Sequence, residues 1–150
     1  MSTELHQLGD AGRVLERLRT ATIEQSAREI EQLYAADAVH EFPFTRPGLP
    51  SRLVGRDAIM EFVLASWTHG PLRYQRYRTV SAYATNDPST VVVQQDVHGT
   101  SSTTGPFVLP NLMVLTVFGG EIHHLRDFVN ILAAFDAIGP ASTSAAEVGS

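Results

Sequence analysis

The spacing of apolar residues changes along the chain, and this change constrains the fold more than any single motif. Before about residue 70 the apolar residues recur at helical spacing, whereas after it they alternate with polar residues, as in strands. The alternating segments are 73–84, 90–100, 105–118 and 121–130. Short stretches rich in Asn, Asp, Pro, Ser, Thr and Gly join them, and such stretches are typical of tight turns. We therefore predict four consecutive strands in an antiparallel meander.

Helices are expected mainly before these strands. The elements predicted outside the meander are helices at 8–22, 25–34, 57–67 and 131–138 and a short strand at 39–44. A proline-rich loop follows the short strand, and we expect residues 140–150, rich in Ala and Ser, to be disordered. Helices followed by a long antiparallel sheet predict an α+β fold. We expect one cone-shaped domain over residues 8–139, with its N-terminal helices packed on the curved sheet.

Composition excludes several classes of chemistry. The chain has no cysteine for disulfides or thiolate nucleophiles, and no lysine for Schiff bases, since all eleven basic residues are arginines. The net charge of −5 argues against binding to nucleic acid. The apolar runs are too short to span a membrane, and the polar start lacks the pattern of a signal peptide. We predict a cytoplasmic protein that binds neither nucleic acid nor membrane.

The segment predicted as the last strand carries an aspartate among apolar neighbours. Alternate side chains of a strand share a face, so His123, Leu125, Asp127 and Val129 are expected to point the same way. Burial of a carboxylate is costly unless something pairs with it or uses it. Asp127 is therefore the first candidate for acid/base catalysis, and an ion pair with an arginine is the structural alternative.

The second strand of the predicted meander has a valine face and a polar face. Val91, Val93, Gln95 and Val97 alternate with the polar set of Gln94, Asp96 and His98. The valine face suits the core or a dimer interface. If the polar face lines the cone, it brings Gln94 and Asp96 towards Asp127, and two carboxylates in one apolar cavity favour an acid and a base at the same pH.

Three short motifs, together with this order of elements, carry a resemblance to a known superfamily. They are Leu33-Tyr34-Ala35-Ala36-Asp37-Ala38-Val39, Gly55-Arg56-Asp57-Ala58-Ile59 and Gly120-Glu121-Ile122. The chain resembles the nuclear transport factor 2-like superfamily over about residues 8–139. It is most similar to the SnoaL-like branch, which includes polyketide cyclases, ketosteroid isomerases and limonene-type epoxide hydrolases. The resemblance implies a cone-shaped cavity and a homodimer formed through the outer face of the sheet.

The isomerase pattern of this superfamily is not reproduced. Its helix-1 tyrosine falls at Leu18, its general-base aspartate at Phe42 and its oxyanion-hole aspartate near Asn111. Of these three positions, only Asn111 can donate a hydrogen bond to a carbonyl oxygen. The resemblance therefore implies that Asn111 polarises a substrate oxygen, with capping of the local backbone as the alternative.

The hydrolase and cyclase patterns of this superfamily both place an aspartate on the last strand. Leu125-Arg126-Asp127-Phe128 resembles the hydrolase segment that carries a working aspartate, and the earlier arginine–aspartate pair of that family falls at Gln94 and Asp96. The aspartate of that pair is present and the arginine is not. The cyclase pattern implies a single acid/base aspartate on the last strand, and Asp127 occupies it.

These observations predict a small enzyme that needs no cofactor and no metal. It would carry out cyclisation or isomerisation of a hydrophobic carbonyl compound, as a polyketide cyclase does. The alternatives are a limonene-type epoxide hydrolase or epoxide-opening cyclase, and a non-catalytic protein that binds a hydrophobic ligand. The candidate catalytic residues are Asp127, Asp96 and Asn111. The candidate substrate-binding residues are His40, Phe42, Trp67, Gln94, Met113 and Leu125.

Overall fold

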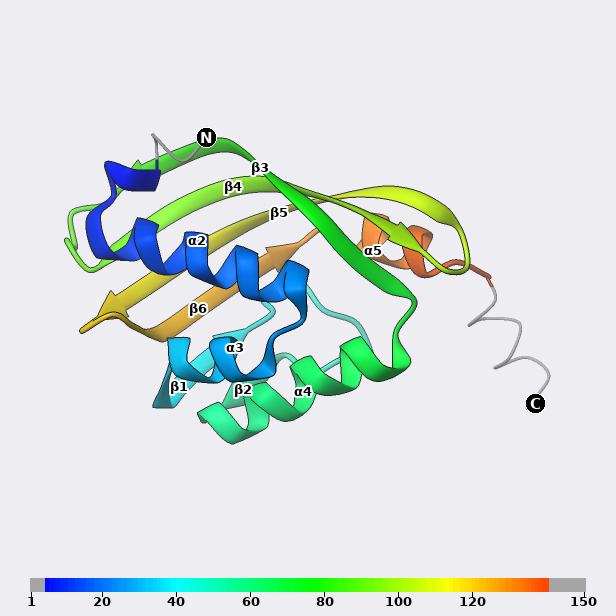
Figure 1. Cartoon of the computed structure of the whole chain (residues 1–150), viewed down its shortest axis with the longest axis horizontal. Coiled ribbons are helices and arrows are strands. Elements are labelled where there is room, and N and C mark those ends of the chain that lie inside the picture. The colour runs from blue at the N-terminus through cyan, green and yellow to red at the C-terminus, as the bar shows by residue number, and fades with distance from the viewer. Residues whose placement is uncertain (1–4, 141–150) are drawn as a thin grey trace.

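A computed structural model describes residues 5–140, and it places helices on one side of a long curved sheet (Figure 1). The helices are α2 (Gly9–Glu24), α3 (Ala27–Leu33), α4 (Arg56–His69) and α5 (Ile131–Ile138). The strands are β1 (Tyr34–Glu41), β2 (Arg52–Val54), β3 (Leu72–Ala84), β4 (Thr90–Ser101), β5 (Gly105–Phe118) and β6 (Glu121–Val129). The predicted α+β fold, with N-terminal helices followed by a curved sheet, is confirmed.

The sheet has six strands in the order β2-β1-β6-β5-β4-β3. The meander β3 to β6 is antiparallel throughout, as the alternating pattern predicts. Strand β1 pairs with β6 in parallel, which makes the sheet mixed rather than purely antiparallel. The edge strand β2 has only three residues after a proline-rich loop, too few for a readable alternation. It is absent from the sequence prediction for that reason.

The boundary between α3 and β1 differs from the prediction. Ser26 caps the start of α3 by accepting a hydrogen bond from the Glu29 amide at 3.3 Å, but the helix ends at Leu33. Strand β1 then begins at Tyr34, which pairs with Ile122 of β6, and it ends at Glu41 rather than at residue 44. The run Ala35-Ala36-Asp37-Ala38 has weak strand propensity. It lies at a register shift between Tyr34 and Val39, and the pairing of those two residues with β6 holds the run in the strand.

The core fills the space between the helices and the concave face of the sheet. Valine side chains of β4 alternate into it, so of the two roles predicted for the valine face, core or dimer interface, the structure shows the core. Buried residues of the neighbouring strands lie in register with them, as Val93 lies opposite Met113 and Leu115 opposite Leu125. Figure 1 shows α2 crossing in front of this face, with α3 and α4 beside it. The residues of β4 that point towards the core are therefore the odd-numbered ones.

A β-bulge in β6 breaks the regular alternation predicted there. Thr116 pairs with His124 and Val117 with Ile122, which leaves His123 without a partner in the ladder. As a result Ile122 and Leu125 are both fully buried, although they are three residues apart. The prediction that His123 shares a face with Asp127 is wrong for this reason. Leu125 and Asp127 do share the buried face.

The end of the described chain is anchored on the sheet. Helix α5 is capped by Asn130, whose side-chain oxygen accepts from the Ala133 amide at 3.0 Å. Thr104 holds its last turn by donating to the Ala137 carbonyl at 2.6 Å. The tail expected to be disordered falls outside the described residues, apart from Pro140. None of the helices within residues 5–140 is long and apolar enough to cross a membrane.

Candidate active site

A cavity of about 320 Å³ lies between the helices and the concave face of the sheet. Its wall is mostly aliphatic and aromatic, with a few polar side chains that come from the strands and from α2. The residues predicted from the sequence that line it are His40, Phe42, Trp67, Asn111, Met113, Leu125 and Asp127. Such a cavity, apolar with a few convergent polar groups, is typical of sites for small hydrophobic ligands.

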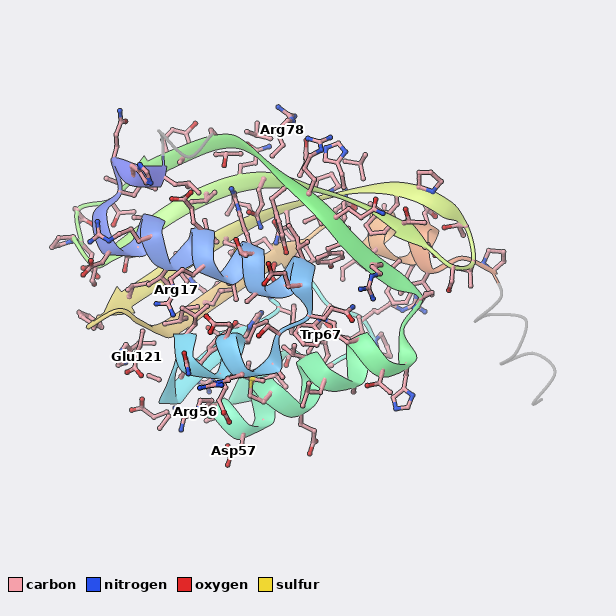
Figure 2. The ribbon with its side chains drawn as sticks, viewed as in Figure 1. Arg17, Arg56, Asp57, Trp67, Arg78 and Glu121 are labelled. Atoms are coloured by element: carbon pink, nitrogen blue, oxygen red, sulfur yellow. The ribbon has the colours of Figure 1, made fainter. Side chains whose placement is uncertain are left out.

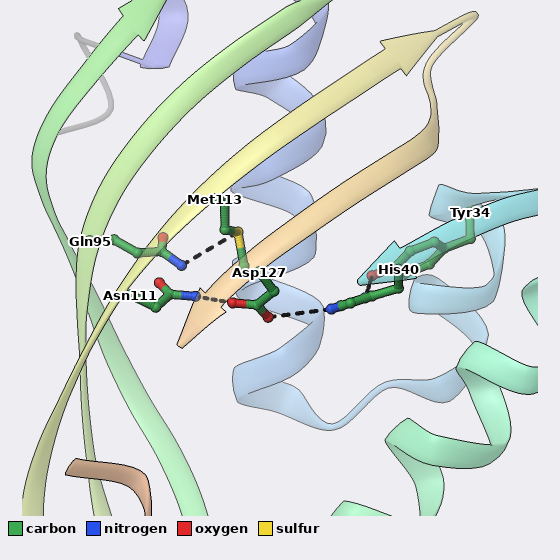
Figure 3. Close-up of polar contacts among 6 residues, drawn as sticks. All are labelled: Tyr34, His40, Gln95, Asn111, Met113 and Asp127. Carbon is green, nitrogen blue, oxygen red and sulfur yellow. Dashed lines mark hydrogen bonds and ion pairs between the residues drawn. The ribbon is translucent and has the colours of Figure 1, made fainter. Parts of the chain in front are cut away.

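Asp127 is buried in this cavity with both carboxylate oxygens bonded (Figure 3). The Asn111 side-chain nitrogen donates to Oδ1 at 2.6 Å, and His40 Nε2 lies 3.3 Å from Oδ2. No arginine pairs with Asp127 among the described residues. The structural alternative, an Asp127–arginine ion pair, is therefore wrong, and a histidine takes its place.

His40 connects Asp127 to a buried tyrosine. The Tyr34 hydroxyl lies 3.2 Å from His40 Nδ1, on the side of the ring away from Asp127. Burial and then the charge of Asp127 raise the pKa of Tyr34 well above its ordinary value, so the phenol stays protonated. With a neutral imidazole, the hydroxyl donates to Nδ1 and the Nε2 hydrogen is donated to Asp127. The strand β1 supplies both His40 and Tyr34 to this chain of hydrogen bonds.

Asn111 holds the other side of the carboxylate. Its amide nitrogen is bonded to Asp127, whereas its oxygen is buried and has no hydrogen-bond partner within residues 5–140. The sequence predicts that Asn111 donates to a substrate oxygen. In the structure one N–H of this amide orients Asp127, and the second N–H and the oxygen have no partner among these residues.

Two polar residues of the cavity are absent from the sequence prediction. Gln95 is fully buried on β4, directly opposite Asn111 of β5. Arg19 of α2 donates from Nε and Nη2 to the Gln95 side-chain oxygen at 2.9 and 2.7 Å. The signal for Gln95 was available, since an amide stands among valines on the core face of β4. Arg19 lies within a charged helix, and nothing in its spacing distinguishes it from surface arginines.

Asp96 and Gln94 lie on the opposite face of β4, and the expectation that this face lines the cavity is wrong. Since the valines alternate with them and occupy the core, the two polar residues point outwards. Asp96 accepts from Arg78 Nη2 at 2.7 Å, and Gln94 accepts from Ser81 at 3.4 Å. Figure 2 shows Arg78 beyond β3, on the side away from α2. Homodimerisation through this outer face stays a prediction.

Aromatic side chains form much of the remaining wall. Phe42 stacks near His40, with ring centroids 4.7 Å apart, and contacts Phe62 of α4 at 5.4 Å. Trp67 points from α4 towards the interior (Figure 2). Tyr74 and Tyr77 of β3 complete the wall, and burial is the main cause that raises the pKa of each phenol. These phenols are therefore neutral hydrogen-bonding groups.

The described residues contain no group of three or more His, Cys, Asp or Glu side chains that could hold a metal ion. The acidic and imidazole groups of the cavity are one carboxylate, Asp127, and one histidine, His40. What the arrangement can do chemically is accept or deliver a proton at Asp127, with His40 and Tyr34 behind it.

Comparison with known proteins identifies the family. Residues 15–125 match the model of the SnoaL-like domain, and the chain belongs to this family. It is similar to an uncharacterized protein of Bacillus subtilis, YesE, with 23% identity over 97% of this chain and 98% of the relative.

Solved structures give the same fold. A candidate isomerase from Bacillus subtilis has a TM-score of 0.80 and 24% identity, covering 87% of this chain and 93% of its own. A candidate polyketide cyclase from Xanthomonas campestris has a TM-score of 0.68 and 20% identity, covering 86% and 96%. An LEH-like epoxide hydrolase from M. tuberculosis has a TM-score of 0.64 and 16% identity, covering 94% and 97%. At these identities the likeness establishes the fold and leaves the reaction open.

Proposed function

We propose that this protein is a cofactor-independent enzyme that moves protons on a hydrophobic carbonyl compound, in a cyclisation or isomerisation of the polyketide cyclase type. The observation that carries this proposal is the position of Asp127. Its carboxylate is buried in an apolar cavity, where the Asn111 amide and the His40 imidazole bond to it and no arginine within residues 5–140 pairs with it. A positioned acid/base group of this kind contributes about 10² to 10⁴ in rate.

The proton would move through the chain of hydrogen bonds described above. Asp127 accepts a proton from the carbon next to the substrate carbonyl and returns it elsewhere on the product. His40, which donates to Asp127 Oδ2, stabilises the carboxylate before the transfer, and Tyr34 fixes the orientation of the imidazole. Asn111 keeps the carboxylate plane fixed from the other side. The apolar wall folds the substrate and excludes water.

Epoxide hydrolysis by a pair of aspartates is less well supported. That mechanism needs Asp96 beside Asp127, whereas Asp96 points to the outer face and pairs with Arg78. The corresponding place in the cavity holds the neutral Gln95. A single aspartate fits proton transfer better than it fits activation of a water between two carboxylates.

Exchange of hydrogen for deuterium tests the proposal without knowledge of the natural substrate. β-Tetralone, an apolar bicyclic ketone, is incubated with the protein in heavy water at mildly acidic pH, where uncatalysed exchange is slow. Loss of the proton signals next to the carbonyl is followed by NMR. We expect the wild type to accelerate exchange and Asp127→Asn to lose about 10² to 10⁴ of that acceleration. Asp96→Asn, the matched control on the outer face, keeps it.

Two outcomes would contradict the proposal. Equal exchange by the wild type and Asp127→Asn would remove Asp127 from the chemistry. Binding of β-tetralone, detected by calorimetry, without any acceleration of exchange would favour a non-catalytic protein that binds hydrophobic ligands.

A further inference from the structure

Arg19 is a buried cation in the cavity wall that lacks an acidic partner. Its side chain is 7% exposed, and it takes part in none of the ion pairs formed within residues 5–140. Glu16, one turn earlier on the helix, forms its ion pair with His6 at 3.2 Å, and its charge raises the pKa of Arg19 by less than burial lowers it. Both hydrogen bonds of the guanidinium go to one neutral atom, the Gln95 oxygen. The Nη1 nitrogen has no partner among these residues.

This arrangement is unfavourable without a further group. A buried cation is normally compensated by a carboxylate, because an amide oxygen returns only part of the lost hydration. The ring of Tyr77, whose centroid lies 5.4 Å from the guanidinium carbon, adds only a weak attraction. Burial accordingly lowers the pKa of Arg19 from its ordinary value, although the group remains charged. The proton-transfer chain of Asp127 does not include this charge.

Arg19 and Asp127 line the same cavity. Gln95, which holds Arg19, is paired across the ladder with Asn111, which holds Asp127. Gln95 on β4, to which Arg19 is bonded, and Asp127 on β6 are therefore two inter-strand spacings apart, which is about 10 Å. A molecule with two fused or linked rings spans this distance.

We propose that Arg19 binds the carboxylate of the substrate, so that the substrate is a hydrophobic carbonyl compound carrying a carboxylic acid. This inference rests on the proposed function for the carbonyl end of the substrate, and it identifies the chemical group at the other end of the substrate. The acid would accept hydrogen bonds from the free N–H groups of Arg19, and the carbonyl would lie at Asp127. A guanidinium is the side chain best suited to bind a planar carboxylate through two N–H groups.

Binding of two matched, unreactive probes tests this. β-Naphthoic acid and β-naphthamide have the same bicyclic body, and they differ in charge at neutral pH. We expect calorimetry to show at least about tenfold tighter binding of the acid, since only the acid can pair its charge with a guanidinium that is already buried without a carboxylate. In Arg19→Gln we expect this preference to disappear. Equal affinity of the two probes for the wild type would overturn the proposal.

A second variant tests the charge without removing Arg19. Gln95→Glu places a carboxylate on the same guanidinium with almost no change in size, so the protein itself occupies the subsite. We expect the acid to lose at least about tenfold in affinity while the amide binds as before. Gln94→Glu is the matched control, because it adds the same charge one residue away on the outer face. If both variants lowered the affinity for β-naphthoic acid equally, the effect would be a general one of charge, and the proposed subsite at Arg19 would be contradicted.

These binding experiments separate the two proposals. The probes undergo no reaction, so loss of the acid preference would leave proton transfer at Asp127 untouched. Conversely, a clear preference for the acid in a protein that fails the β-tetralone exchange assay would support the carboxylate subsite at Arg19 and would contradict the proposed enzymatic activity.

Discussion

Asp127 and Asp96 lie on strands of the same sheet that are separated by β5, and their surroundings differ completely. Asp127 on β6 faces the cavity, where Asn111 and His40 hold it. Asp96 on β4 faces outwards, and its partner Arg78 is about half exposed. An ion pair at the surface contributes little, whereas a buried carboxylate with no arginine partner is costly and persists where it is used. The face that a side chain occupies therefore decides which of the two acids is a candidate for catalysis.

The largest expected difference between the two faces is in stability. Leu125 is fully buried beside Asp127, and Val108 is half exposed on the outer side of β5. We expect Leu125→Ala to lower the free energy of unfolding by about 2–5 kcal/mol, because it enlarges the cavity and removes apolar contacts. Val108→Ala should change it by less than about 0.5 kcal/mol. Urea denaturation measures both, and similar losses would show that the faces are not distinct.

Two histidines of the paired strands β1 and β6, His40 and His124, sharpen the comparison further. His40→Phe keeps an aromatic ring in the cavity but removes the group bonded to Asp127 Oδ2. We expect exchange of saturating β-tetralone to slow by about 10²-fold, since the carboxylate loses its orientation, with little change in the affinity for the ketone.

His124→Phe is the control for this prediction. His124 contacts Glu41 and does not line the cavity, so its replacement should leave the exchange rate unchanged. If the two variants slowed exchange equally, the contact between His40 and Asp127 would have no catalytic significance.

A smaller effect is expected from the tyrosines of the cavity at alkaline pH. Tyr34, Tyr74 and Tyr77 have pKa values raised above the ordinary 10.0, chiefly by burial. The unfolded chain therefore loses these protons at lower pH than the folded protein does. The contribution of these phenols to the free energy of unfolding is complete below pH 10, and it is lost as the pH rises towards the pKa values of the folded protein.

Denaturation by urea at several pH values around 10 measures this dependence. We expect stability to fall more steeply with pH in the wild type than in the variant Tyr74→Phe/Tyr77→Phe, which has two phenols fewer in the cavity. Identical slopes would mean that these two phenols ionise as easily in the folded protein as in the unfolded chain.

Much of the fold could be predicted because the long strands carry a regular alternation. The meander and its turns follow from valines at every second position of β4 and from the glycines before β6. The start of β1 could not be predicted, since Ala35 and its neighbours favour a helix, and they are held in the strand by the pairing of Tyr34 and Val39 with β6 on either side of them. The bulge at His123 is likewise a property of two paired strands, and it has no signal within β6 alone.

The site was predicted in part for a related reason. Asp127, Asn111 and His40 were identified from single strands or from the resemblance, and the structure brings them together. Asp96 is a wrong candidate, because alternation divides β4 into two faces without showing which of them lines the cavity. Gln95 stands among the valines of the other face. Arg19 could not be predicted, because its contact with Gln95 joins residues 76 positions apart.

The most direct test of the account follows the side-chain carboxyl signals of the two aspartates by NMR while β-tetralone is added. Single Asp→Asn variants assign each signal. The account predicts that the Asp127 signal shifts along a saturable binding curve and that the Asp96 signal does not move. A shift of the Asp96 signal, or an unchanged Asp127 signal in the presence of bound ketone, would contradict the claim that the inner carboxylate is the one that meets the substrate.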